Sequence, residues 1–318
     1  MNESLTTLID SHRILVVGDI MLDRYWSGSV TRISPEAPVP VVSVDSVTEC
    51  VGGAGNVAAN IRSIGAQCCL LSIVGDDASG RLLNSLLAES GVDRHLHIDT
   101  ENRTTEKLRV VSQNQQLIRV DFEGAPSVSL TECVLDDYER LLAGVSVVVV
   151  SDYGKGGLSN VPQIVSLARR HEIPVVVDPK GADFSDYRDA SIVTPNTMEF
   201  VRCVGDCQTT EEFNKKAYSL VEKLSLQGLL VTRGSEGMTL FTEDGECIHQ
   251  SSNVRQVYDV SGAGDTVVAA IAVFLACGMS WNEILKYADT AAGIAVGKFG
   301  TATVTLPEIL SQLERETV

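Results

Sequence analysis

The residues best suited to chemistry form a glycine-rich turn, Gly262-Ala263-Gly264-Asp265, which opens a helical stretch near the end of the chain. Small residues leave backbone N–H groups bare, and the positive end of a helix dipole favours an anion there. Asp265 is unsuited to binding phosphate, but its carboxylate could act as a general base on a hydroxyl that attacks phosphorus. The turn therefore indicates phosphoryl transfer, unless Asp265 only caps the helix, as Asp often does.

A second glycine cluster, GGAGN at residues 52–56, contains a match to the dinucleotide-binding fingerprint. Asp76 lies about 20 residues further on, where that motif carries a ribose-binding acid. The residues before the cluster are polar rather than a buried strand, which disfavours an NAD site. A helix start that needs close approach explains the glycines, but it does not explain Asn56 and Asn60, whose amides share a helical face and suit several hydroxyls.

A third cluster, TRGSEG at residues 232–237, follows a predicted strand. It suits a loop at the edge of a nucleotide, although a hairpin turn would have the same composition. No GxxxxGK[ST] motif occurs in the sequence, which excludes a P-loop NTPase. Phosphoryl transfer without a P-loop is therefore the leading interpretation.

Three motifs in this order resemble the ribokinase-like (PfkB) carbohydrate kinases: the glycine pair with Asn56, an NxxE element at residues 196–199, and the turn that ends at Asp265. The resemblance covers essentially residues 13–305. Further runs are similar to the D-glycero-β-D-manno-heptose-7-phosphate kinase branch of that family: GDIMLDRYW at 18–26, RISPEAPVPVV at 32–42, KLRV at 107–110, NQQLIR at 114–119 and SDY at 151–153.

The resemblance implies an ATP-dependent kinase that phosphorylates O1 of the heptose 7-phosphate, giving the 1,7-bisphosphate for ADP-heptose and lipopolysaccharide core synthesis. Some such enzymes are fused to an adenylyltransferase, but this sequence has no HxGH motif, so we expect a separate adenylyltransferase in the pathway. The alternatives are a ribokinase-like kinase for another sugar phosphate or nucleoside, and a sugar-binding regulator without turnover. The presence of Asp265 argues against the regulator, because a pure binder needs no base.

On the catalytic and nucleotide side, the resemblance implies that Asp265 is the base and that Gly262, Ala263 and Gly264 form the anion hole. It implies ATP and Mg²⁺ as cofactors, with a monovalent cation as an optional third. We expect the cofactor-binding residues to be Asn196, Thr197, Met198, Glu199, Lys180, Thr232, Gly234 and Gly237, with Glu199 and, through water, Asn196 on the metal. The spacing of Asn196 and Glu199 is also that of a helix capping box, so the sequence leaves a purely capping role as an alternative.

On the sugar side, the resemblance implies Asp23, Gly53, Asn56, Asn60, Lys107 and Arg109 as substrate-binding residues. The chain has 25 Lys and Arg against 42 Asp and Glu, a formal net charge of −17. A phosphorylated sugar therefore needs local cations, and Lys107 and Arg109 alternate on one face of an extended segment where they could bind the 7-phosphate. The alternative is that both side chains lie on a solvated strand face.

The strands and helices predicted around these residues indicate an α/β fold. Short apolar strands are predicted at 13–18, 68–74, 145–150, 173–177, 191–194 and 228–232, and helices at 79–88, 161–171, 210–225, 264–277 and 281–296. This alternation predicts a mostly parallel sheet flanked by helices. Two extended insertions at about 36–48 and 103–123 break it, and we expect them to form a small β lid on a single domain, 1–318.

Composition excludes several other classes of function. The acidic balance disfavours nucleic acid and anionic membranes as partners. No apolar run approaches the length of a membrane span, no signal peptide is evident, and the 8 cysteines form no CxxC pair, so we expect a reduced, cytoplasmic protein. The lid has more apolar residues than one sugar site needs, and ribokinase-like relatives dimerise through such lids, so we expect a homodimer.

Overall fold

The computed structural model of the chain describes residues 2–113, 115–158, 160–252 and 257–316. Asn114, which belongs to one of the motifs quoted above, lies outside them. The helices are α1 (Asn2–Asp10), α2 (Ala54–Ile64), α3 (Ala78–Glu89), α4 (Val128–Leu141), α5 (Val161–Arg170), α6 (Thr197–Val204), α7 (Thr210–Leu224), α8 (Ala263–Ala276), α9 (Trp281–Ala295) and α10 (Leu306–Glu316), with short 3₁₀ turns at Ser185–Tyr187 and Gly234–Glu236. The strands are β1 (Arg13–Gly18), β2 (Ile20–Ile33), β3 (Pro40–Gly53), β4 (Gln67–Gly75), β5 (Asp93–Asp99), β6 (Glu106–Ser112), β7 (Gln115–Phe122), β8 (Val147–Ser151), β9 (Val175–Asp178), β10 (Ile192–Val193), β11 (Gly228–Thr232), β12 (Met238–Thr242) and β13 (Cys247–Gln250).

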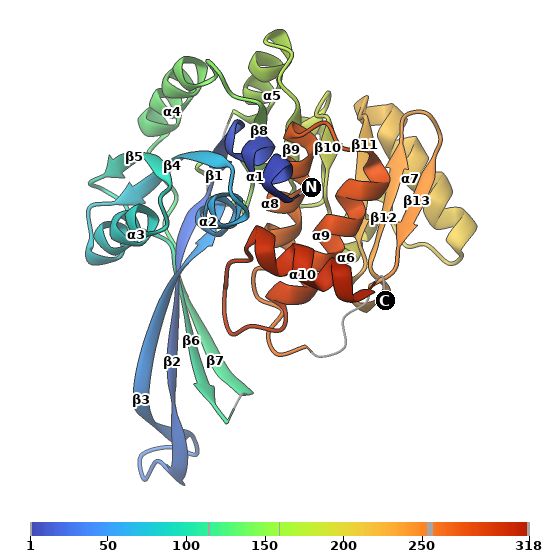
Figure 1. Cartoon of the computed structure of the whole chain (residues 1–318). Coiled ribbons are helices and arrows are strands. Elements are labelled where there is room, and N and C mark those ends of the chain that lie inside the picture. The colour runs from blue at the N-terminus through green and yellow to red at the C-terminus, as the bar shows by residue number, and fades with distance from the viewer. Residues whose placement is uncertain (1, 114, 159, 253–256, 317–318) are drawn as a thin grey trace.

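Within the described residues the strands form two sheets (Figure 1). The larger has nine strands in the order β13-β12-β11-β10-β9-β8-β1-β4-β5. Its strands pair in parallel from β11 to β5, and β12 and β13 add an antiparallel hairpin at one edge. The predicted mostly parallel sheet is therefore confirmed.

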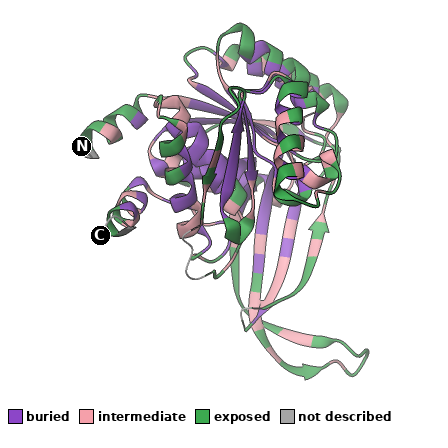
Figure 2. Ribbon diagram, turned by 90° about the vertical axis from the view of Figure 1, so that its right-hand side faces the viewer, coloured by how far each residue is buried: buried purple, intermediate pink, exposed green. Residues whose placement is uncertain are grey.

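Helices cover both faces of this sheet because its central strands are apolar on both sides. In β1, Ile14 and Val16 pack into one hydrophobic cluster, with α1, α2, α3, α8, α9 and α10. Leu15 and Val17 point the other way into a second cluster, with α4, α5, α6 and α7. Figure 2 shows the buried strands between the two helical layers. A continuous apolar run of this kind is typical of a doubly covered parallel strand.

Helix α8 carries the glycine-rich turn at its first residues and lies among the most buried elements. Ten of its residues, from Asp265 to Phe274, are buried, and it packs against α2 and α9. Its many Ala and Val side chains allow this close approach. With 14 residues it is the most apolar helix, and no helix in the described part of the chain has the length and hydropathy to cross a membrane.

The smaller sheet, in the order β3-β2-β6-β7, is the predicted lid and extends away from the main sheet (Figure 1). Its first insertion is longer than the predicted 36–48, since β2 already begins at Ile20. Only Asp19 separates β2 from β1. From the sequence alone, the start of β2 therefore cannot be distinguished from the end of the core strand β1. The lid is also mixed rather than purely antiparallel, because β2 pairs in parallel with β6.

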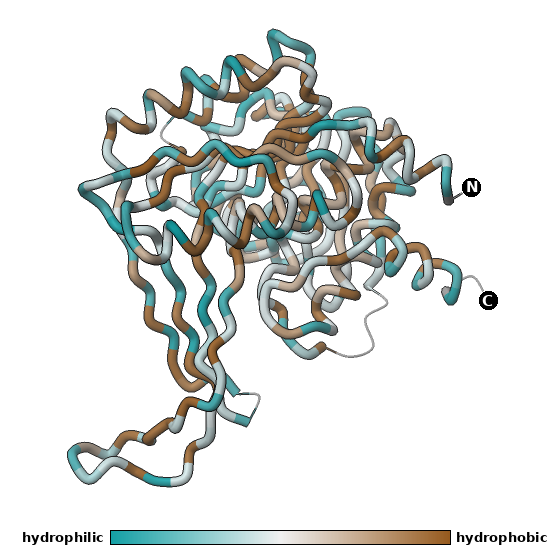
Figure 3. Tube along the Cα trace, turned by 60° about the vertical axis from the view of Figure 1, so that its left-hand side comes forward, coloured by the Kyte–Doolittle hydropathy of each residue, from teal (hydrophilic) through white to brown (hydrophobic). Residues whose placement is uncertain are grey.

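The two faces of the lid differ in chemistry because side chains alternate along each strand. On one face Asp23 of β2 lies opposite Lys107 of β6. On the other face Trp26 lies opposite Val110, which in turn lies opposite Ile118 of β7. Figure 3 shows this alternation of hydrophilic and hydrophobic residues along the lid.

Candidate active site

The turn before α8 positions Asp265 and requires glycine. Gly262 caps the helix with a φ of 75°, and a Cβ there would lie 2.5 Å from the Asn56 side-chain nitrogen. A Cβ on Gly264 would meet nothing within 4 Å, so this side of the turn is open. Because first-turn N–H groups have no partner within the helix, the open side suits an anion.

Asp265 is buried and both of its carboxylate oxygens are hydrogen-bonded. The side-chain amide of Asn56 donates to Oδ2 at 2.7 Å, and the Tyr153 hydroxyl donates to Oδ1 at 2.5 Å. Burial raises the pKa of Asp265 to about 6, against the opposing effect of these two hydrogen bonds. A carboxylate with this pKa is ionised at neutral pH and still able to accept a proton, as a general base requires.

Asn60 lies behind Asn56 rather than at the site surface. Its amide nitrogen donates to the Asn56 backbone oxygen at 3.0 Å and to Asn56 Oδ1 at 3.1 Å. Its own oxygen accepts from the Val304 backbone N–H at 3.1 Å. Since these three hydrogen bonds engage both ends of the amide within the protein, the predicted sugar contact does not match its position. Asn60 instead orients Asn56 so that the Asn56 amide faces Asp265.

The predicted lid residues converge on the same place. Arg109 donates to Asp23 Oδ1 at 2.5 Å, and its guanidinium lies 5.1 Å from the Tyr25 ring centroid. The Lys107 ammonium lies 5.1 Å from the Tyr153 ring centroid. Burial lowers the pKa of Lys107, and its attraction to Asp23 opposes that effect. The two cations thus differ, because Arg109 is ion-paired with Asp23 whereas Lys107 lies over the Tyr153 ring, within electrostatic range of Asp265.

A pocket of about 170 Å³ opens on the other side of Asp265. Its lining includes these predicted residues: Lys180, Asn196, Glu199, Thr232, Gly262, Gly264 and Asp265. Asn196 and Glu199 form the capping box that their spacing allowed, with Glu199 N–H donating to Asn196 Oδ1 at 2.9 Å. The capping box uses Glu199 Oε2, which accepts from the Asn196 N–H. The other oxygen, Oε1, lies 3.1 Å from Lys180 Nζ and remains in the pocket.

Asp178, at the end of β9, is a pocket carboxylate to which the sequence analysis gave no role. Its backbone oxygen accepts from the Asp152 N–H at 3.1 Å, but no described residue donates a hydrogen bond to its carboxylate, which lines the pocket with Asp265 and Glu199. Burial and these two carboxylates raise the pKa of Asp178 well above its usual range. A carboxylate without a donor beside two others is an arrangement that a divalent cation stabilises, and Mg²⁺ prefers oxygen ligands. The residues therefore fit Mg²⁺.

Four predicted cofactor residues, Thr197, Met198, Gly234 and Gly237, are not among the residues that line this pocket. Thr197 donates its hydroxyl to the Thr232 backbone at 3.2 Å, and the Met198 side chain is mostly exposed. Gly234 and Gly237 belong to the turn between β11 and β12. A Cβ on Gly237 would lie 2.0 Å from the Gln250 backbone oxygen, which explains that glycine by close strand approach. The cluster is thus a hairpin turn between the antiparallel strands β11 and β12, and its role at the edge of a nucleotide stays a prediction.

Tyr153 is the second site residue to which the sequence analysis gave no role. Its signal, like that of Asp178, is its position just after the carboxyl end of a parallel strand, where α/β sheets bind ligands. Asp19, just after β1, holds the Tyr153 loop by accepting hydrogen bonds from three backbone N–H groups.

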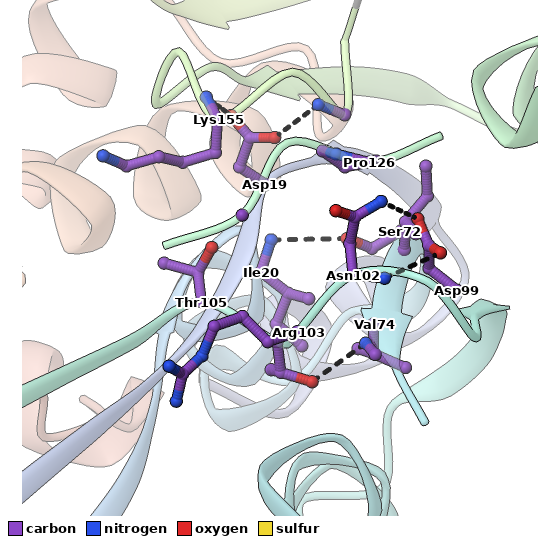
Figure 4. A pocket seen from close by; sticks show the side chains of 15 residues that line it. Asp19, Ile20, Ser72, Val74, Asp99, Asn102, Arg103, Thr105, Pro126 and Lys155 are labelled. Atoms are coloured by element: carbon purple, nitrogen blue, oxygen red, sulfur yellow. Dashed lines mark hydrogen bonds between the residues drawn. The ribbon is translucent and has the colours of Figure 1, made fainter. Parts of the chain in front are cut away.

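Asp19 also borders a cavity of about 20 Å³ at the root of the lid (Figure 4). That cavity has room for little more than one water molecule.

The comparison with protein families agrees with this geometry. A family model described as pfkB family carbohydrate kinase matches residues 11–309. The chain belongs to the pfkB family of carbohydrate kinases, and it is thus a sugar kinase, a phosphotransferase with an alcohol group as acceptor.

Similar curated proteins fall into two kinds. The D-beta-D-heptose 7-phosphate kinase of Bordetella bronchiseptica is 47% identical over 312 residues, which are 98% of this chain and 99% of that protein. The bifunctional protein HldE of Stutzerimonas stutzeri is 48% identical over 307 residues, 96% of this chain and 65% of that protein. This chain therefore spans about two thirds of the length of its bifunctional relatives.

Solved structures confirm the ribokinase-like fold. Phosphofructokinase-2 from Escherichia coli, in complex with substrates and products, aligns with a TM-score of 0.84 at 21% identity, over 96% of this chain and 100% of that one. Ribokinase from Arabidopsis thaliana, in complex with ribose and ATP, aligns with a TM-score of 0.76 at 23% identity, over 95% and 99%.

Proposed function

We propose that this sugar kinase transfers the γ-phosphate of ATP to O1 of D-glycero-β-D-manno-heptose 7-phosphate. The observation that carries the proposal is the position of Asp265 between the lid cations and the pocket that holds Lys180. The name of the full-length relative from Bordetella bronchiseptica supports the choice of sugar. An adenylyltransferase acting on the product is expected as a further enzyme of the pathway, and the cytoplasm, where ATP is made, is the expected compartment.

In this mechanism Asp265 accepts the proton of the O1 hydroxyl. A sugar hydroxyl is a poor nucleophile at neutral pH, and a positioned base contributes roughly 10²- to 10⁴-fold to the rate. The bare N–H groups of the Gly262-Ala263-Gly264 turn stabilise the transferring phosphoryl group. Ala263 N–H already donates to Val260 at 3.3 Å, so the remainder of the turn supplies most of the stabilisation.

On the nucleotide side, Lys180 supplies a positive charge for the ATP phosphates. Asp178 and Glu199 are the residues that would hold Mg²⁺, and Asn196 supports Glu199 through the capping box. When bound, Mg²⁺ neutralises charge on the phosphates. A monovalent cation stays a prediction.

On the sugar side, Lys107 supplies the free positive charge for the 7-phosphate. Asp23 accepts hydrogen bonds from the hydroxyls, and Arg109 holds Asp23 in place by their ion pair. The chain carries a net charge of −17, which repels a sugar phosphate. The cations of this cluster supply the local positive charge that such a substrate needs. Gly53 lies beside the Tyr153 ring, and the Asn56 amide donates to Asp265.

We further propose a homodimer through the lid. The outer lid face carries a row of apolar residues across all four strands, namely Val47, Trp26, Val110 and Ile118. Val47 and Ile118 are each more than half exposed. A four-stranded sheet with an uncovered apolar face is marginal alone, and a second lid would cover it. The alternative is a monomer whose lid closes over its own site.

The test is a coupled assay of ADP release with a panel of sugar phosphates, sugars and nucleosides. We expect heptose 7-phosphate to have the highest kcat/KM, with ³¹P NMR of the product showing a new phosphate at O1. Preference for another acceptor would replace the heptose assignment while keeping the kinase. Binding without ADP release would favour a regulator.

A further inference from the structure

Tyr153 occupies a tightly held position. Its backbone N–H donates to Asp19 at 3.0 Å, and the N–H groups of Lys155 and Gly157 donate to the same carboxylate at 2.9 and 3.0 Å. Asp19 is itself buried. A Cβ on Gly53 would lie 3.4 Å from the Tyr153 ring, an ordinary contact distance, so the ring lies directly beside Gly53. The loop therefore places the ring beside the end of β3.

The Tyr153 hydroxyl contacts the proposed base directly, since it donates to Asp265 Oδ1 at 2.5 Å. Burial and the Asp265 carboxylate raise the pKa of Tyr153 well above its usual range, so the phenol keeps its proton and acts as a donor. A hydrogen bond to a carboxylate favours its ionised form. Each carboxylate oxygen also has a second lone pair, which leaves Asp265 able to accept the substrate proton.

The Tyr153 ring contacts cations from both sides of the site. Lys107, from lid strand β6, lies 5.1 Å from the ring centroid, and Lys180, which follows β9 in the nucleotide pocket, lies 5.9 Å from it. Ammonium groups at these distances are attracted by the negative face of an aromatic ring. One side chain thus contacts the base, a lid cation and a pocket cation.

We propose that Tyr153 is a positioning residue whose hydroxyl keeps the Asp265 carboxylate oriented and whose ring holds Lys107 next to it. The inference deepens the proposed kinase function and rests on it. Neither role requires Tyr153 to touch the substrate.

Other charged groups also act on Asp265, and they come from several elements. They are Asp23 of β2, Lys107 of β6 and Asp178 of β9. Lys180 after β9 and Glu199 of α6 line the same pocket as Asp265. The Asn56 amide of α2 completes the surroundings. Tyr153→Phe leaves all of these groups in place, so a change in the titration of Asp265 reports on the hydroxyl alone.

The experiment compares pH profiles of kcat/KM for the wild type and Tyr153→Phe. Since the hydroxyl stabilises the ionised base, its removal moves the acid limb to higher pH, by about one unit. The matched control is Tyr138→Phe, which also removes a buried tyrosine hydrogen bond, 3.0 Å to the Ile164 oxygen, but in the core between α4 and α5. We expect the control to keep the wild-type profile even if it loses stability.

Two further measurements keep the test decisive. Replacing Tyr153 by 3-fluorotyrosine makes the phenol a stronger donor and moves the acid limb in the opposite direction, with the ring retained. A ¹³C NMR titration of the Asp265 carboxyl gives the same shifts without turnover. Tyr153→Leu also removes the ring, so it raises the KM for the sugar phosphate beyond that of Tyr153→Phe.

Superimposable titrations of the wild type and Tyr153→Phe would overturn the inference. An equal loss of activity at every pH, with no shift of the acid limb, would reduce Tyr153 to a packing residue. Absence of ADP release from the wild type with every sugar phosphate would instead contradict the proposed function, and the NMR titration would still decide the role of Tyr153.

Discussion

The side-chain amide of Asn60 donates to both the backbone and the side-chain oxygen of Asn56, at 3.0 and 3.1 Å. This pair decides which end of the Asn56 amide faces Asp265. The nitrogen of Asn56 must point at the carboxylate because its oxygen is already engaged by Asn60. The orientation of the base therefore depends on a residue that does not itself reach the pocket.

Asn60→Ala is expected to lower both stability and kcat. The substitution leaves the Val304 N–H and the Asn56 oxygen unpaired in the core, at a cost of roughly 1–3 kcal/mol for each group. Urea unfolding measures the loss of stability, and steady-state kinetics measures kcat. The control is Asn84→Ala, where an exposed amide accepts a hydrogen bond from Arg94 and the change should be small. Unchanged kcat in a folded Asn60→Ala variant would contradict the positioning role.

Asp265→Asn is expected to lower kcat by at least about a hundredfold while ATP still binds, because only the proton acceptor is lost. Isothermal titration calorimetry measures ATP binding, and the ADP assay measures kcat. Near-normal turnover would reduce Asp265 to a helix cap.

The same variant is expected to be more stable than the wild type at high pH. The pKa of Asp265 is raised from 3.8 to about 6 in the folded state, so the fold binds the proton more tightly than the unfolded chain does. The wild type therefore loses stability as pH rises from about 4 through 6, by roughly 1–3 kcal/mol, and Asp265→Asn does not. Thermal unfolding at pH 4.5 and 8 measures the difference. The exposed Asp136→Asn is the control, and an advantage independent of pH would contradict the linkage.

Lys107→Ala combined with Arg109→Ala is expected to raise the KM for the sugar phosphate roughly ten- to a hundredfold, and far more than the KM for ATP. The double substitution removes the Lys107 charge that would bind the 7-phosphate. It also removes Arg109, the ion-pair partner of Asp23. The matched control is Arg140→Ala, a surface cation on α4 that pairs with Asp137. Equal increases for both substrates would remove the 7-phosphate assignment.

Val110→Lys with Val120→Lys in the lid is expected to dissociate the dimer, because both side chains lie on the apolar lid face and a buried ammonium without a partner is costly. Light scattering at micromolar concentration should give twice 34.1 kDa for the wild type and 34.1 kDa for the variant. Val128→Lys, at an exposed position on α4, is the control. A wild-type mass near 34.1 kDa would contradict the dimer, and a dimeric variant would show that the interface lies elsewhere.

The sequence by itself determined those features that depend on neighbouring residues. The strand at Arg13–Gly18 was predicted with its observed bounds, because a β-branched run that ends at glycine has few other conformations available. The turn at Gly262 and the capping box of Asn196 and Glu199 are also local, since glycine permits the positive φ and an Asn three residues before a Glu closes the box.

Only the tertiary structure decided which distant side chains meet. Tyr153 contacts Asp265 across 112 residues, and Asn56 contacts it across 209. The sequence placed Asn60 at the sugar because two amides on one helical face look alike, but its bond to Val304, 244 residues away, directs it into the core. Periodicity sets the face on which a side chain lies, whereas its partner depends on how sheet register and loops bring separate elements together.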